Sequence, residues 1–292
     1  MQSSAYVLMT AAKNEESHIR KTLQSVVDQT RLPKAWVIVS DGSTDRTDEY
    51  VRDYASRYSF VHLLRRNSTG ERSFSSKSFA LNTAYAEIRE AEWEFVGILD
   101  ADVALPPNYY ENLLARFDIE PCLGIAGGVI VEDNGRGWQT RHSESPGEVA
   151  GALQFFRRGC YEDTGGFIPL KWGGEDAALI AIAKQKGWLV RTFNHLHALH
   201  YRPTGTAGAS VHQARFRQGM QDYFLGYHPV FEFGKCVRRI LEPPYFTGSV
   251  SRLCGYLWPR IQGARPSTPE DFVRSLRRQQ MRRLWSHHTE GT

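Results

Sequence analysis

The sequence has few cysteines and lacks the two commonest phosphate-binding fingerprints. Its 4 cysteines in 292 residues form no Cys-x-x-Cys pair, so neither zinc nor dithiol chemistry is indicated and we expect ordinary reduced thiols. Neither the Gly-x-Gly-x-x-Gly fingerprint nor the P-loop pattern occurs. Any phosphate group must therefore be bound by other means.

Long hydrophobic runs are absent as well. No stretch approaches the roughly 18 apolar residues that a membrane-spanning helix needs, and the first residues show no charged segment followed by a long apolar core. We therefore expect a cytoplasmic protein. The chain has no internal repeat or low-complexity tract, and its length suits one large α/β domain with an appendage.

Charge is unevenly distributed along the chain. From Arg202 onward there are 14 Lys and Arg against 6 Asp and Glu, whereas the preceding part has 22 against 26. A basic tail after an acidic body indicates an anionic partner for the tail, either a membrane surface or nucleic acid.

An apolar run from Phe95 to Val103 ends in two aspartates, Asp100 and Asp102, one residue apart. A run of this length predicts a buried strand, and because carboxylates do not suit its interior, both should lie at its exit. At the carboxyl edge of a parallel sheet they can face the crevice in which open α/β sheets bind ligands. Two oxygen ligands there suit a divalent cation that keeps several waters and bridges to phosphate oxygens.

Strands and helices alternate before this run. Strands are expected over residues 6–10, 35–40 and 61–64, and helices over residues 17–29, from about residue 45, and over 77–90. This alternation predicts a parallel sheet with right-handed crossovers. Asp41 follows the second strand, which gives a further carboxylate at a strand exit.

Several short motifs then occur in an order that is typical of one enzyme family. They are Thr10-Ala11-Ala12-Lys13-Asn14-Glu15-Glu16, Asp41-Gly42-Ser43-Thr44-Asp45, Leu99-Asp100-Ala101-Asp102, residues 151–158, Gly165-Gly166-Phe167 and Trp172-Gly173-Gly174-Glu175-Asp176. Together they resemble the family 2 glycosyltransferases of the GT-A fold, over roughly residues 5 to 205. The resemblance implies a mixed, mostly parallel α/β sheet flanked by helices, a UDP-, GDP- or dTDP-sugar donor, and a divalent cation, Mn or Mg. We expect a GT-A domain over residues 1–205 and a basic, aromatic-rich helical extension over residues 206–292.

The resemblance also implies which residues contact the nucleotide. They are Thr10, Ala11, Ala12, Glu15, Asp41, Lys77, Asp100 and Ala101. The backbone at residues 10–12 and the Glu15 side chain would contact the nucleoside, and Asp41 would accept a hydrogen bond from the base. Cations near the strand ends are Arg65, Arg72 and Lys77, and Lys77 is preferred for the diphosphate. Helix capping is the alternative role of Glu15 and Asp41, and solvated loop charge is the alternative for the cations.

A second carboxylate pair, Glu175 and Asp176, begins an apolar helix after a flexible Trp-Gly-Gly turn. Acidic residues commonly complement a helix start, which is their alternative role. By resemblance this pair supplies the catalytic base. Asp176 would take the proton of the acceptor hydroxyl as it attacks the anomeric carbon opposite the leaving nucleoside diphosphate, which inverts that centre.

The resemblance implies Asp102, Asp100 and His200 as metal ligands. Asp102 would hold the cation, while Asp100 contacts the ribose or acts through water. Three histidines lie between residues 195 and 200, and strand alternation puts His195 and His197 on one face with His200 past the strand's end. A half-buried structural histidine is the alternative. Residues 132–147 show no periodicity and are expected to form a mobile loop near the acceptor.

The tail ends in a basic amphipathic helix over residues 272–285, in which apolar residues mix with five arginines. Such helices can lie in a membrane interface, so we expect an anionic membrane surface rather than nucleic acid as the partner. Packing on the catalytic domain or a homodimer is the alternative. A peripheral membrane position fits a lipid-linked saccharide acceptor in polysaccharide or glycolipid assembly.

Two other functions stay open. A sugar nucleotidyltransferase shares a similar sheet and metal, but it usually has a Gly-rich, basic loop after its first strand, where this chain has residues 11–16. A non-catalytic scaffold or binding protein could use the basic tail, but the acidic pairs at residues 100–102 and 175–176 argue against it.

Overall fold

The computed structural model describes residues 4–67, 74–133, 137–140, 147–170, 172–202 and 210–286. Within them the chain folds as two compact units. The first comprises the described residues up to Pro169 and from Glu175 to Arg202, and the second those of Leu170–Gly174 and from Ser210 onward. The domain boundary at residue 205 stays a prediction, and no pattern in the sequence indicates that Leu170–Gly174 groups with the second unit.

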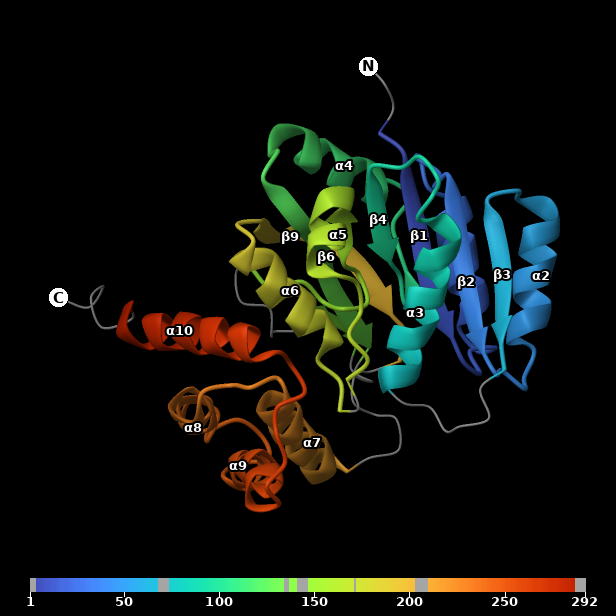
Figure 1. Ribbon diagram of the computed structural model, residues 1–292. Coiled ribbons are helices and arrows are strands. Elements are labelled where there is room, and N and C mark those ends of the chain that lie inside the picture. The colour runs from blue at the N-terminus through green and yellow to red at the C-terminus, as the bar shows by residue number, and fades with distance from the viewer. Residues whose placement is uncertain are drawn as a thin grey trace. The chain divides into compact units, whose positions relative to one another are not determined.

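The first unit is built on one mixed sheet, in which the described residues form nine strands (Figure 1). They are β1 (Tyr6–Ala12), β2 (Ala35–Asp41), β3 (Val61–Arg66), β4 (Phe95–Ile98), β5 (Val103–Ala104), β6 (Leu123–Asp133), β7 (Trp138–Thr140), β8 (Phe155–Arg157) and β9 (Leu189–His200). The order is β3-β2-β1-β4-β8-β6-β9-β5, with β7 paired to β6. Strands β1 to β4 are parallel, as the sequence predicts, and β8 runs against both of its neighbours.

Helices cover both faces of this sheet. They are α1 (Ile19–Val27), α2 (Thr47–Arg57), α3 (Phe74–Ile88), α4 (Tyr109–Ile119), α5 (Arg158–Thr164) and α6 (Glu175–Gln185). Along β1, Tyr6 and Leu8 join the core with α1, α2 and α4, while Val7 and Met9 join the core with α3, α5 and α6. All four are buried, so β1 is hydrophobic throughout, as expected of a strand in a parallel sheet that is covered on both faces.

The apolar run that ends in two aspartates leaves the sheet where the sequence predicts. Strand β4 ends at Ile98, and the chain turns through Asp100 and Asp102 before β5. Met9 accepts a backbone hydrogen bond from Leu99 at 3.1 Å, which ties this turn to β1. Both carboxylates therefore lie at the strand exit and not inside the sheet.

The loop expected over residues 132–147 is wrong in part. Glu132 and Asp133 still belong to β6, and β7 pairs antiparallel with them. The hairpin carries the exposed side chain of Trp138. The remaining residues of the expected loop, 134–136 and 141–146, lie outside the described part of the chain.

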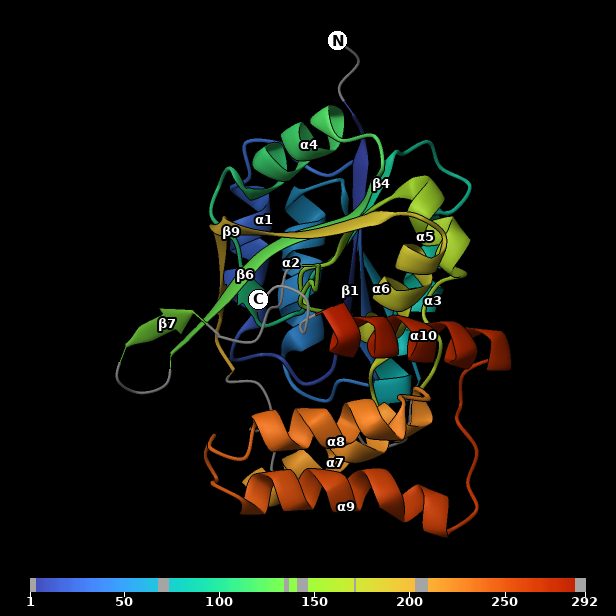
Figure 2. The same cartoon turned by 90° about the vertical axis from the view of Figure 1, so that its left-hand side faces the viewer.

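The second unit is helical. Its described residues form α7 (Val211–Phe224), α8 (Pro229–Arg238), α9 (Thr247–Ile261) and α10 (Glu270–Ser286), and Figure 2 shows α8 and α9 side by side. Helices α7 and α9 pack so closely that only glycine fits at their contact. A Cβ at Gly219 or Gly255 would lie about 2 Å from a backbone oxygen of the other helix. No described helix is long and apolar enough to cross a membrane.

Helix α10 is the basic amphipathic helix that the sequence predicts, but the apolar side chains of its first two turns are already covered. Phe272, Val273 and Leu276 are buried. The Gly226 carbonyl accepts a hydrogen bond from Arg277, and Gln280 accepts one from the backbone of His228 at 2.8 Å. These apolar side chains are therefore not available for a membrane interface.

Candidate active site

Lys77 and Asp100 form an ion pair at the carboxyl end of β4. The Lys77 Nζ lies 2.6 Å from Asp100 Oδ1. Lys77 lies in the first turn of α3, the helix that precedes β4 in the chain. Burial alone would lower the pKa of Lys77, but Asp100, Glu175 and Asp176 raise it above its ordinary value. A protonated ammonium group therefore faces three carboxylates from two parts of the sequence.

Asp102 and Glu132 hold His200 between them. In the sheet register His200 pairs with Glu132 on β6 and with Val103 on β5, so both carboxylates reach the imidazole from neighbouring strands. His200 Nε2 lies 3.3 Å from Asp102 Oδ1, and Nδ1 lies 2.9 Å from Glu132 Oε1. Burial would lower the pKa of His200, but hydrogen bonding to Asp102 and Glu132 raises it above its ordinary value.

Arg202 connects this cluster to Glu15. Its guanidinium forms a two-point ion pair with the buried Glu15 carboxylate and lies 3.7 Å from Asp102 Oδ2. Burial would raise the pKa of Asp102, but His200 and then Arg202 hold it below its ordinary value, so the carboxylate is ionised. Glu15 is thus tied to the metal-ligand candidates by a residue that lies 187 positions away in the sequence.

The end of β1 borders the candidate site with backbone groups more than with side chains. Thr10 is buried, and its hydroxyl donates to the Leu99 carbonyl at 2.7 Å while it accepts from the Trp36 indole at 2.9 Å. Ala11 and Ala12 follow it to the strand end. The side chain of Thr10 therefore fastens β1 to the β4 turn.

Asp41 ends β2 as the sequence predicts. Its Oδ1 lies 3.1 Å from Arg66 Nη1 on β3, whereas its Oδ2 is buried and accepts no hydrogen bond from the described residues. A buried acceptor without a donor is costly, so Oδ2 is suited to a donor from a ligand. Neither Asp41 nor Glu15 caps a helix, since α2 begins at Thr47 and α1 at Ile19.

Glu175 and Asp176 are the first two residues of α6. Glu175 is only 6 % exposed, and its Oε2 finds no hydrogen-bond donor among the described residues. The Asp176 side chain lies directly over Gly151, where a Cβ would come within 2.6 Å of Asp176 Oδ2. Gly151 therefore makes room for the carboxylate that the sequence assigns to base catalysis.

We expect Glu175 to lower the stability of the protein as pH rises from about 4.5 to about 7. Burial first, and then the charge of Asp176, raises the pKa of Glu175 from 4.5 to about 7. In this window the folded protein binds more protons than the unfolded chain, so the free energy of unfolding falls by up to about 3 kcal/mol. The Glu175→Gln variant should lose this fall when urea unfolding is measured at pH 5 and pH 8.

The matched control is Glu162→Gln, which changes an exposed glutamate on α5 that pairs with Arg158. It should keep the pH dependence of the wild-type protein. Glu232 of the second unit also has a pKa raised to about 7, and because it is present in all three proteins the comparison isolates Glu175. An unchanged pH dependence in Glu175→Gln would contradict the burial argument.

Some expected positions need correction. Arg65 lies near the end of β3 as expected, but it pairs with Asp48 on α2 at 2.7 Å, and Arg66 is the residue that reaches Asp41. Arg72 lies outside the described residues. His200 is the last residue of β9 and does not lie past its end. The four cysteines are free thiols, as predicted.

Three residues of the site were missed in the sequence. Glu132 falls in the stretch that was expected to be a loop, Arg202 was counted only as the start of the basic tail, and Gly151 lies in a motif of mixed composition. The apolar run Val129-Ile130-Val131, which leads directly into Glu132, is the one signal that could have extended β6 to this residue.

Asp102 and His200 are suitable for a divalent cation. A carboxylate and an imidazole suit Mn²⁺, and their facing atoms, 3.3 Å apart, can share one ion. Asp100 and its neighbour Ala101 complete the turn, with the Ala101 carbonyl bonded to Thr22 at 2.8 Å. The described residues contain no group of three or more His, Cys, Asp or Glu side chains arranged to hold a metal. Such a cation would thus need further ligands from substrate phosphates and water.

The chain matches one protein family and its members. The model of glycosyl transferase family 2 matches residues 8–175. The chain is 29% identical over 120 residues to the poly-beta-1,6-N-acetyl-D-glucosamine synthase of Staphylococcus epidermidis, covering 41% of this chain and 27% of that protein. It is 28% identical over 188 residues to the beta-monoglucosyldiacylglycerol synthase of Synechocystis, covering 63% of this chain and 37% of that protein. The chain thus spans between a quarter and two fifths of these relatives.

The fold is that of known glycosyltransferases. The mannosyltransferase PcManGT from Pyrobaculum calidifontis, solved with GDP-Man and Mn²⁺, superimposes with a TM-score of 0.56 at 20% identity, covering 100% of this chain and 77% of that one. The predicted GT-A fold class is therefore confirmed. Since the family model matches more than half of the sequence, the chain belongs to glycosyl transferase family 2.

Proposed function

We propose that this protein is an inverting, metal-dependent glycosyltransferase that transfers a sugar from a nucleoside diphosphate sugar to a hydroxyl acceptor. The observation that carries the proposal is the convergence of Glu175 and Asp176 from α6 with Lys77 and Asp100 at the end of β4. It puts a candidate base and a candidate diphosphate-binding group in one site.

The donor nucleotide is bound along the carboxyl ends of β1, β2 and β4. Asp41 Oδ2 accepts a hydrogen bond from the base, and the backbone at residues 10–12 with Glu15 borders the nucleoside. The buried, unsatisfied oxygen of Asp41 supports the first assignment. Lys77 exchanges part of its ion pair with Asp100 for the diphosphate, and Asp100 turns toward the ribose.

Asp102 and His200 hold the divalent cation, Mn²⁺ or Mg²⁺. When bound, that cation neutralises the charge that develops on the departing diphosphate. Arg202 keeps this carboxylate ionised and oriented when the cation is bound, since His200 must lose its Nε2 proton to serve as a ligand. The Mn²⁺ in the mannosyltransferase structure supports a cation in this fold.

Asp176 acts as the base toward the acceptor hydroxyl. Gly151 leaves space beside its carboxylate, and the backbone N–H of Ala177 orients Oδ1 at 2.8 Å. Glu175, with a pKa raised to about 7, is partly protonated near neutral pH and limits repulsion within the pair. Attack from the side opposite the diphosphate inverts the anomeric carbon.

The acceptor is proposed to be a lipid-linked saccharide that reaches the enzyme at the cytoplasmic face of a membrane. One matched relative is named as a synthase of a glucosyl diacylglycerol, which supports a lipid-bound acceptor class. Tyr201 stacks on His18 and meets Trp138 edge-on at 5.7 Å, beside His200 and Arg202 in the chain. Aromatic faces of this kind suit the apolar face of a sugar ring.

The test is a transfer assay with Mn²⁺ and a panel of UDP-, GDP- and dTDP-sugars, followed by NMR of the product. We expect release of one nucleoside diphosphate and a product of inverted anomeric configuration. A product that keeps the configuration of the donor would remove Asp176 from the role of base. Formation of a sugar nucleotide from a nucleoside triphosphate would assign the site to nucleotidyl transfer.

A further inference from the structure

Helices α8 and α9 of the second unit turn apolar side chains outward. We call the outer apolar face the set of Val230, Phe233 and Val237 on α8, Leu241, Tyr245 and Phe246 between the helices, and Val250, Leu257, Trp258 and Ile261 on α9. Phe233 is 57 % exposed, Trp258 49 % and Ile261 78 %. On α8 these residues recur three or four positions apart, and on α9 the exposed Cys254 lies between Val250 and Leu257, so each helix carries an exposed stripe that is mostly apolar.

The inward side of the same helices is charged. Arg252 on α9 is buried and pairs with Glu232 on α8 at 2.7 Å and with Asp222 on α7. Lys235 adds a contact of 2.9 Å to Asp222. This arrangement reverses the pattern of a water-exposed helical unit, in which apolar stripes face inward and charges outward. Apolar stripes that large on a surface mark an interaction site.

The exposed charged side chains of residues 210–265, the segment that carries the outer apolar face, are almost all positive. Exposed arginines are Arg217, Arg238, Arg260 and Arg265. Among the described residues from 210 to 265 Glu242 is the one exposed acidic side chain, and it lies 4.0 Å from Arg215 and 3.9 Å from Arg239. A second copy of the chain would bring arginines against arginines, whereas an anionic surface would neutralise them.

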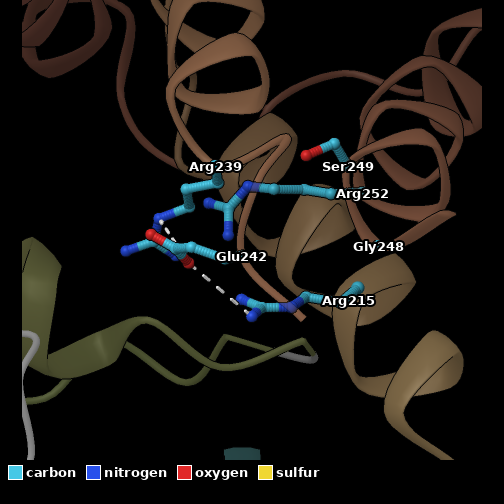
Figure 3. A pocket seen from close by; sticks show the side chains of 6 residues that line it. All are labelled: Arg215, Arg239, Glu242, Gly248, Ser249 and Arg252. Carbon is cyan, nitrogen blue, oxygen red and sulfur yellow. Dashed lines mark ion pairs between the residues drawn. The ribbon is translucent and has the colours of Figure 1, made fainter. Parts of the chain in front are cut away.

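A small pocket lies where α8 leads into α9. Figure 3 shows it lined by Arg215, Arg239, Glu242 and Arg252, with Gly248 and Ser249 at the start of α9. Arg252 is neutralised by its buried partners, so Arg215 and Arg239 share the single carboxylate of Glu242. The pocket therefore keeps a net positive charge next to Leu241, Tyr245 and Phe246.

We propose that the outer apolar face docks on an anionic lipid bilayer, with a lipid phosphate at Arg215 and Arg239. Exposed aromatic and aliphatic side chains with flanking arginines are the composition of an interfacial membrane site. This surface differs from α10, in which Phe272, Val273 and Leu276 are buried. The proposal does not depend on glycosyl transfer, because binding to lipid requires neither donor nor acceptor.

Sedimentation with vesicles tests it, using the full chain without nucleotide and vesicles of phosphatidylcholine alone or with about a third phosphatidylglycerol. We expect binding to the anionic vesicles that weakens in 0.5 M salt. The double variant Phe233→Gln/Trp258→Gln should bind at least about 10-fold more weakly. The matched control Leu32→Gln/Ile119→Gln changes two exposed apolar residues of the first unit and should bind like the wild type.

The pocket is tested separately with Arg239→Gln. It should lessen the preference for anionic over neutral vesicles, and 10 mM inorganic phosphate should not displace the protein if a bilayer, not free phosphate, is the ligand. Equal binding of the Phe233→Gln/Trp258→Gln variant and its control would overturn the proposal. So would sedimentation equilibrium that shows a dimer which only this double variant dissociates, since the face would then join two copies.

Discussion

Asp176→Asn is expected to lower kcat by about 10³-fold while leaving the affinity for the donor nucleotide within about 2-fold. General base catalysis contributes roughly 10²–10⁴-fold, and an amide in this place can neither take the acceptor proton nor carry charge. The fold should be unaffected, because Asn keeps the size of the side chain over Gly151 and can still accept the Ala177 hydrogen bond. Steady-state kinetics and nucleotide titration measure the two quantities.

The matched control is Asp118→Asn, which removes an exposed carboxylate of α4 from the same unit. It should keep wild-type kinetics. If Asp176→Asn retained more than about a tenth of the wild-type kcat, the base would have to be sought elsewhere. Glu175 would be the next candidate, since its pKa of about 7 lies close to the value that suits a general base.

Asp102→Asn is expected to reduce kcat/KM by about 10²–10³-fold in the presence of Mn²⁺. A bound cation supplies several kcal/mol of stabilisation to developing charge, and each 1.36 kcal/mol corresponds to a factor of 10. Asparagine keeps an acceptor for His200 and similar packing, so the substitution removes charge with little change of shape. Thermal unfolding with UDP, GDP or dTDP, each with and without Mn²⁺, gives a second readout.

In that experiment the wild-type protein should gain additional stability from one nucleotide when Mn²⁺ is added, and Asp102→Asn should lose only this additional part. The nucleotide alone should stabilise both proteins equally, because Asp41 and the end of β1 are unchanged. An unaltered Mn²⁺ effect in Asp102→Asn would contradict the assignment of Asp102 as the metal ligand.

The sequence predicted the elements whose signals are local. The apolar runs of β1, β2 and β4, the helical spacing of α1, and the polar residues at strand exits depend on neighbours along the chain. For the same reason Asp41, Asp100 and Asp102 could be located at strand ends from the sequence alone. The start of α6 at Glu175 was predicted in the same way.

What could not be predicted depends on contacts between distant parts of the chain. Arg202 meets Glu15 across 187 positions, and no periodicity reports a pair of that kind. The choice of Arg66 over Arg65 at Asp41 follows from the face on which each lies in β3. In the sequence, α8 and α9 cannot be distinguished from ordinary amphipathic helices. The pattern gives the spacing of the apolar residues but not whether they face the core or the solvent.

The five residues before α6 group with the helical unit, although they lie within the sequence of the first unit. Leu170–Gly174 belong to the second unit, where Trp172 stacks on Phe224 and a Cβ at Gly174 would meet Gln221 and Leu225 at 2.8 Å. The next residue is Glu175, followed by Asp176. Ending the chain at residue 205 would therefore not separate the two units cleanly. It would remove Phe224, Gln221 and Leu225, which contact this short segment. Glu175 and Asp176 follow this segment directly in the chain, so a truncation that removes the second unit would also change the residues that lead into the proposed acid pair.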